Sequence, residues 1–189
     1  MKKILFLILL FIVVGVSAKS EVSFDRCVDG DTAWLKSGTE SLKYRFLAID
    51  TPETIHPFKE TSLYGRTASD YTCNRLKEVK KIEVEYDPKS TKTDKYGREL
   101  VWIYLDDELF QLELIKKGYA KVEYIYGKYM YLDELRKDEE IAKLNKIGIW
   151  GNTYTVTFKY RNSINKVEVI EGSKVEPISI TKEKGYEFL

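Results

Sequence analysis

Short runs rich in β-branched and aromatic residues recur along the first two thirds of the chain, separated by turn-forming Asp, Gly and Pro residues. Runs of this kind are typical of β-strands. They predict five strands, at 22–28, 32–36, 42–49, 81–86 and 100–105, and a further extended segment at 120–126.

Three other segments repeat apolar residues at helical spacing instead. The periodicity predicts helices at 63–79, 108–117 and 130–146. Gly118 and Gly148 follow the second and third segments, where glycine is typical of a helix end. Five strands interrupted by three helices predict an α+β, mainly β domain at 21–150, built as a five-stranded OB-fold barrel with three helices. An α+β sandwich has the same order of elements and is the alternative.

The N-terminus has the order of regions of a secretory signal peptide. Lys2 and Lys3 precede the apolar run 4–16, and the small residues Val16-Ser17-Ala18 come at its end. An uncleaved anchor is the alternative, but a span needs roughly 20 apolar residues. We therefore predict that residues 1–18 are a signal peptide cleaved near Ala18 and that the protein is secreted, extracellular or at the cell surface.

Composition narrows the chemistry further. The chain of 189 residues has 31 Lys and Arg against 30 Asp and Glu, a net charge of +1, so a nucleic-acid partner would be held by local patches. One histidine, His56, and two cysteines argue against a Cys/His zinc site and against schemes with several histidines. An enzyme of this composition would rely on carboxylates, arginines, tyrosines and a hard metal ion.

Charged residues cluster at the ends of three predicted strands. The clusters are DGDT at 29–32, Arg45 with DTPE at 50–53, and TDKYGR at 93–98. Two carboxylates brought together would hold Ca²⁺ with positions left for water, and a third could take a proton from that water. Two guanidinium groups would bind a phosphate. These are the parts of a phosphodiesterase, although any single acidic residue at a strand end is more simply a turn former.

A longer series of motifs resembles the staphylococcal nuclease (thermonuclease) family. The series is DGDT at 29–32, RFLAIDTPE at 45–53, YG at 64–65, KKIEVEYD at 80–87, TDKYGR at 93–98, GYAKVEYIY at 118–126, LRK at 135–137 and GIW at 148–150. It extends from about Val22 to Trp150 in the order of the family and with similar spacing. The resemblance implies an OB-fold and a Ca²⁺-dependent nuclease that cleaves DNA and RNA and leaves 3′-phosphate ends.

The resemblance also implies roles for single residues. Asp31, Asp50 and the carbonyl of Thr51 would bind Ca²⁺, Glu53 would position and activate the attacking water, and Arg45 and Arg98 would grip the phosphate. Lys95, Tyr96, Tyr124 and Tyr126 would bind the substrate, with plain packing as the alternative for the tyrosines. His56 matches a surface-loop histidine without a catalytic role. The segment 127–132 departs from the family pattern and leaves the substrate preference open.

A noncatalytic OB-fold module for nucleic-acid binding or surface attachment is the alternative function. Such modules have lost catalytic carboxylates or arginines, whereas this chain retains the full set. We therefore expect a hydrolase, a thermonuclease-like endonuclease that acts as a monomer.

The two cysteines form an even pair in a chain expected to be exported. Cys27 and Cys73 are 46 positions apart, and a disulfide between them would stabilise the fold by roughly 4 kcal/mol on the chain-entropy estimate. Two buried free thiols are the alternative.

Beyond Trp150 the pattern changes to short alternating strands, at 154–160, 167–169 and 178–180. The segments YTVTFKY, EGSKV and TKEKGYEFL resemble a truncated Listeria–Bacteroides (internalin B type) surface repeat. We expect residues 153–189 to form a small β-rich extension that associates with a cell surface or wall. An unrelated β-hairpin is the alternative.

Overall fold

The computed structural model describes residues 18–53, 63–160 and 163–172. Along the chain, its elements are β1 (Ser20–Cys27), β2 (Thr32–Ser37), β3 (Glu40–Phe46), β4 (Ile49–Asp50), α1 (Leu63–Glu78), β5 (Ile82–Glu85), β6 (Glu99–Leu105), β7 (Glu108–Leu109), α2 (Phe110–Lys116), β8 (Lys121–Val122), α3 (Leu132–Leu144), a 3-10 turn (Gly148–Trp150), β9 (Thr153–Tyr160) and β10 (Ser163–Ile170).

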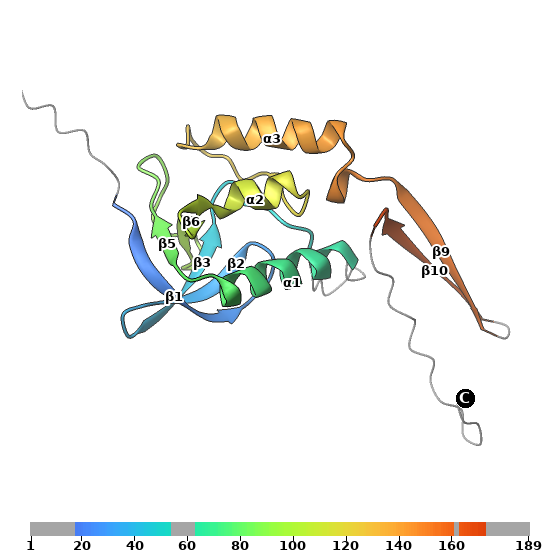
Figure 1. Cartoon of the computed structure of the whole chain (residues 1–189), viewed down its shortest axis with the longest axis horizontal. Coiled ribbons are helices and arrows are strands. Elements are labelled where there is room, and N and C mark those ends of the chain that lie inside the picture. Colours follow the sequence, from blue (N-terminus) through green and yellow to red (C-terminus); the bar gives the residue numbers. More distant parts are fainter. Residues whose placement is uncertain (1–17, 54–62, 161–162, 173–189) are drawn as a thin grey trace, which may run out of the picture.

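The larger sheet closes into a barrel. Its strand order is β3-β2-β1-β5-β6-β7, and β3 also pairs in parallel with β6, so that β1, β2, β3, β5 and β6 surround one core. The remaining pairings are antiparallel. Within the described ranges, three α-helices accompany this barrel (Figure 1). The OB-fold prediction is confirmed, and the closure excludes the α+β sandwich.

The core is one cluster of buried side chains from the barrel strands and the helices. Its largest fully buried side chains come from the strands and from all three helices: Leu35, Tyr44, Phe46, Ile49, Leu76, Trp102, Ile103, Leu105, Phe110, Leu114, Ile115 and Leu135. Gln111 is also fully buried, and its amide accepts the N–H of Ile103 and donates to the carbonyl of Val101. One α2 side chain thereby satisfies two backbone groups of β6 and fixes the helix on the barrel.

The predicted strand 42–49 is interrupted. β3 ends at Phe46, and Ala48 adopts a left-handed conformation with φ of 63°. The chain then continues as β4, which pairs with β8 rather than with the barrel. The apolar run alone could not show this break, because every residue from Tyr44 to Ile49 is buried, on both sides of it.

The second and third helices are shorter than predicted. Asp106 and Asp107 both have positive φ, which makes a tight hairpin turn, so Glu108 and Leu109 pair with β6 before α2 begins. α3 ends at Leu144, because Lys146 adopts φ of 53° and the N–H of Ile147 bonds back to the carbonyl of Ala142. Leu144 at the end of α3 is largely exposed.

A disulfide connects the barrel to the first helix. It joins Cys27, the last residue of β1, to Cys73 in α1, with 5.7 Å between the two Cα atoms. Of the two alternatives that the sequence left open, the structure has the bonded form.

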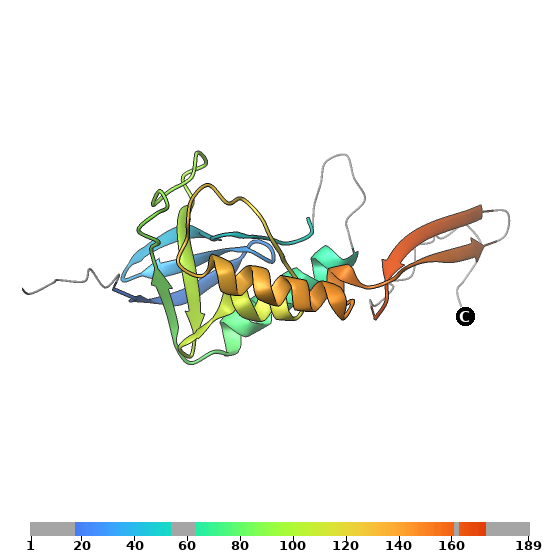
Figure 2. The same ribbon diagram turned by 90° about the horizontal axis from the view of Figure 1, so that it is seen from above.

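The C-terminal strands form a separate hairpin. β9 and β10 pair in an unbroken antiparallel register, and among the described residues they add no strand to the barrel. The hairpin projects beyond the ends of α1 and α3 (Figure 1 and Figure 2). The predicted strand 178–180 and the predicted signal peptide, up to residue 17, lie outside the described residues. In the described ranges, none of the helices has both the length and the apolar character needed to cross a bilayer.

Candidate active site

A cavity of about 710 Å³ opens on the barrel where the β1–β2 turn, the end of β3 and the loop before β6 meet. The predicted catalytic, metal-binding and substrate-binding residues all line it: Asp31, Arg45, Asp50, Thr51, Glu53, Lys95, Tyr96, Arg98, Tyr124 and Tyr126. They come from five segments of the chain that only the closed barrel brings together.

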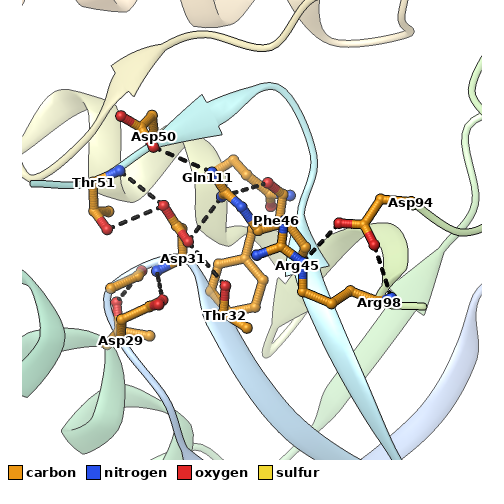
Figure 3. Close-up of polar contacts among 12 residues, drawn as sticks. Asp29, Asp31, Thr32, Arg45, Phe46, Asp50, Thr51, Asp94, Arg98 and Gln111 are labelled. Atoms are coloured by element: carbon orange, nitrogen blue, oxygen red, sulfur yellow. Dashed lines mark hydrogen bonds and ion pairs between the residues drawn. The ribbon is translucent and has the colours of Figure 1, made fainter. Parts of the chain in front are cut away.

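One guanidinium group joins the two carboxylates predicted to bind calcium (Figure 3). Arg45 Nη1 lies 2.9 Å from an oxygen of Asp31, and Nη2 lies 3.3 Å from an oxygen of Asp50. The arginine is placed by register, since residue 45 on β3 pairs with Thr32 on β2, directly after Asp31. Arg45 and Asp31 are both buried, so their charges are held in place and little screened by water.

The second oxygen of Asp31 is bound by Thr51. The Thr51 backbone N–H donates to it over 2.9 Å, and the Thr51 hydroxyl donates over 3.1 Å. The hydroxyl of Thr32 donates to the first oxygen over 3.0 Å. These contacts orient the Asp31 carboxylate before any ligand binds.

Carboxyl groups lie close to one another at this point, and their pKa values respond. Burial, and after it the charge of Asp31, raise the pKa of Asp50. The same two causes raise the pKa of Asp29 to about 7. Lys121 is the second cation near Asp50, with its Nζ 3.5 Å from the carboxylate. The carboxylates of Asp31 and Asp50 lie close enough to raise the pKa of Asp50, and a further cation between them would relieve this repulsion.

The donor set suits a hard cation. Among the described residues, no three Asp, Glu, His or Cys side chains are gathered as a complete metal site. The oxygens assigned to a cation in the sequence analysis, those of Asp31, Asp50 and the Thr51 carbonyl, belong to residues that line the cavity, which leaves room for water to complete the shell. Oxygen ligands with several waters fit Ca²⁺ and do not fit the nitrogen and sulfur preference of Zn²⁺.

Arg98 is held in a tight turn at the opposite rim. Asp94 accepts its Nε over 2.7 Å and its backbone N–H over 3.0 Å. Although burial opposes the shift, these hydrogen bonds and one from the Tyr96 N–H lower the pKa of Asp94. The exposed Tyr96 ring lies 5.5 Å from Arg98 Cζ and 5.0 Å from Lys95 Nζ. The turn presents two cations and one aromatic ring to the cavity.

Tyr124 and Ala48 are strained residues that face the same cavity. Both have left-handed backbone conformations, with φ of 58° and 63°, and the carbonyl of Ala48 accepts the N–H of Glu123. A bulky residue rarely adopts this conformation, and such strain concentrates at functional sites. It places the Tyr124 ring 5.6 Å from Arg45 Cζ. Tyr126, two residues on, is 84% exposed and free to stack on a ligand.

Glu53 is exposed at the rim, and within the described part of the chain its carboxylate has no bonded partner. The backbone of Glu53 packs directly against Gly65 of α1. A Cβ at position 65 would lie only 2.5 Å from the Glu53 carbonyl oxygen. Only glycine allows α1 to approach this closely. His56 lies outside the described residues.

Several residues of the site received no role in the sequence analysis. Asp29 and Asp94 belong to the quoted motifs, but the partners that they bind depend on turn geometry. Lys121 and Tyr129 reach the site through tertiary contacts, and the Tyr129 hydroxyl accepts the N–H of Tyr126. One sequence signal could have indicated such a contact: Asp94 lies four residues before Arg98 in a predicted turn.

The fold and the site define an OB-fold protein with a buried carboxylate–arginine centre in an open cavity. Residues 43–152 match the family described as staphylococcal nuclease homologue. The chain is also 32% identical over 140 residues to the thermonuclease of Staphylococcus hyicus, covering 73% of this chain and 81% of the relative. The chain belongs to the staphylococcal nuclease family.

Two relatives from Bacillus subtilis (strain 168) are similar over the same region. The SPbeta prophage-derived endonuclease YokF is 39% identical over 138 residues, which are 72% of this chain and 46% of the relative. Endonuclease YncB is 38% identical over 137 residues, which are 72% of this chain and 64% of the relative. This chain therefore spans about half to two thirds of the length of these two proteins.

Proposed function

We propose that this protein is a calcium-dependent endonuclease that hydrolyses the phosphodiester bonds of DNA and RNA and leaves 3′-phosphate ends. The convergence of two carboxylates and two arginines in one cavity carries the proposal. Membership of the staphylococcal nuclease family supports it, as do the similar proteins named as endonucleases and thermonuclease.

Asp31, Asp50 and the Thr51 carbonyl would hold the cation. When bound, Ca²⁺ supplies charge stabilisation for the phosphate and favours ionisation of a coordinated water. Arg45 already bonds both carboxylates through separate nitrogens, so its fork lies beside the proposed metal ligands, where it would bind an oxygen of the phosphate. Arg98, held through Nε by Asp94, keeps its terminal nitrogens for the same phosphate.

Glu53 would act on the attacking water. Its carboxylate lines the cavity without a bonded partner among the described residues and can therefore accept a proton. Its position two residues after Thr51 places it near the proposed metal ligands without making it one of them.

The exposed rings explain why both nucleic acids are proposed as substrates. Tyr96, Tyr124 and Tyr126 are 72%, 50% and 84% exposed around the cavity, close to the cations Lys95, Arg98 and Arg45. Aromatic stacking and backbone charge bind single strands with little dependence on sequence or sugar.

The test is digestion of DNA and RNA by the purified protein with Ca²⁺ or with a chelator, followed by analysis of the ends. We expect acid-soluble fragments with 3′-phosphates that form only when Ca²⁺ is present. Binding of nucleic acid without any cleavage would instead establish the alternative, a noncatalytic OB-fold module.

We also propose that the protein is exported and that residues 153–189 attach it to a cell surface or wall. The disulfide supports export, since such bonds persist in oxidising compartments. Tyr154 and Ile164 of the hairpin, 50% and 61% exposed, support an attachment role. Co-sedimentation with purified cell walls should retain the full chain and lose a chain that ends at Asn152. Equal retention of both would place attachment elsewhere.

A further inference from the structure

A second, smaller cavity lies between β1 and α1. It measures about 440 Å³ and is lined by both cysteines of the disulfide together with residues of β1 and α1. Cys27 is only four residues before Asp31, so the covalent bond is close to one of the proposed calcium ligands.

The residue next to Cys73 holds the same turn. Thr72 is fully buried in α1, and its hydroxyl donates to the carbonyl of Gly30 over 2.8 Å. Two adjacent α1 residues therefore bond to the chain on each side of Asp29. Cys73 forms the disulfide with Cys27, and Thr72 forms the hydrogen bond with the backbone of Gly30.

Gly30 also packs against Thr51, in the segment that carries the other proposed calcium ligands. A Cβ on Gly30 would lie 2.8 Å from the Thr51 hydroxyl oxygen and 2.9 Å from the Thr51 Cβ. The Thr51 hydroxyl and N–H donate in turn to Asp31. The turn is thus packed between α1 and Thr51, and a shift of α1 away from β1 would loosen the carboxylate.

We infer that the Cys27–Cys73 disulfide and the Thr72–Gly30 hydrogen bond form a clasp whose function is to position the Asp31 carboxylate for Ca²⁺. Cys27, Cys73 and Thr72 are positioning residues, since they act through the turn and touch neither metal nor substrate. The inference rests on the proposed calcium-dependent function. Partners that orient a metal ligand typically contribute about 10- to 100-fold to metal affinity.

The experiment compares Ca²⁺ affinity, measured by calorimetry well below the unfolding temperature, in four variants and the wild-type protein. We expect Cys27→Ser/Cys73→Ser to weaken Ca²⁺ binding by about 10-fold or more and Thr72→Val by about 3- to 10-fold, near the lower limit for the loss of a group that orients a metal ligand. Thr72→Ser keeps the hydroxyl and should restore wild-type affinity. Leu76→Ala, a fully buried change one turn further along α1, should lower thermal stability with an unchanged Ca²⁺ dissociation constant.

Reduction of the wild-type protein provides a second measurement should the double variant fail to fold. A dithiol such as dithiothreitol transfers two electrons and two protons, so that the disulfide becomes two thiols and the reagent becomes a cyclic disulfide. Ca²⁺ affinity should fall on reduction and return on reoxidation, while circular dichroism stays constant.

The outcomes separate the two claims. Wild-type Ca²⁺ affinity in folded Thr72→Val and in the folded reduced protein would overturn the clasp and leave the proposed nuclease intact. Equal weakening in Leu76→Ala would also overturn it, because general loosening of α1 would then explain the result. Failure of the wild-type protein itself to bind Ca²⁺ would overturn both.

Discussion

The cavity-bearing face of the barrel and the C-terminal hairpin are built in opposite ways. At the cavity, the single residue Asp31 is bonded by three side chains or backbone groups. They belong to Thr32, Arg45 and Thr51, which lie on different segments. In the hairpin, each residue of β9 pairs with a residue of β10 in one uninterrupted local register. Distant contacts bury and orient charged groups, whereas local pairing leaves most side chains in solvent.

This difference affects energetics as well as geometry. Buried carboxylates and arginines held by several partners are preorganised, which is the condition under which electrostatic contacts are strongest. An isolated two-stranded hairpin is only marginally stable, and of its described side chains Val169 alone is buried. We therefore expect catalysis to depend on the barrel and to be nearly independent of the hairpin.

The largest loss should follow Glu53→Gln, which removes a proton acceptor and keeps the size of the side chain. General bases typically contribute about 10²- to 10⁴-fold, so turnover should fall by that order while nucleotide binding changes little. Steady-state cleavage kinetics and nucleotide titrations measure the two effects. Glu134→Gln, on the exposed face of α3, is the matched control; full activity of Glu53→Gln would remove this residue from the mechanism.

Arg45→Lys should cost about 10²-fold in turnover, the scale of losing one preorganised contact to the transition state. Lysine keeps the charge but lacks the fork that reaches Asp31 and Asp50 together. The comparison is with Arg136→Lys at an exposed position of α3. Equal losses in the two variants would mean that Arg45 is only one part of a basic surface.

The smallest effect should come from ending the chain at Asn152. Every cavity residue lies between Asp29 and Tyr129, so cleavage should stay within about twofold of the full-length rate. Stability should fall by less than about 3 kcal/mol, since the loss of one buried apolar contact around Val169 is the main change. A shortened chain that keeps its circular dichroism and loses cleavage would place the hairpin in the active unit.

The sequence predicted the barrel because strand and turn signals are local. Asp29-Gly30-Asp31 and Thr51-Pro52 are strong local signals for the end of a strand, and residues at the ends of neighbouring strands tend to meet. The helix ends were harder to predict, since both helical and hairpin paths bury the apolar residues that follow Asp107. Leu109 and Phe110 are buried on either side of that boundary.

By itself, the sequence determined which chemistry is available: carboxylates, arginines and tyrosines in recurring motifs, with almost no histidine. Only the tertiary structure decided which of these groups bond to one another. Arg45 bridges Asp31 and Asp50, Asp94 engages Arg98, and α1 grips the turn through Thr72 and Cys73. The physical reason is that pairing and burial depend on angstrom-scale distances between segments far apart in the chain, which closure of the barrel sets and no local pattern records.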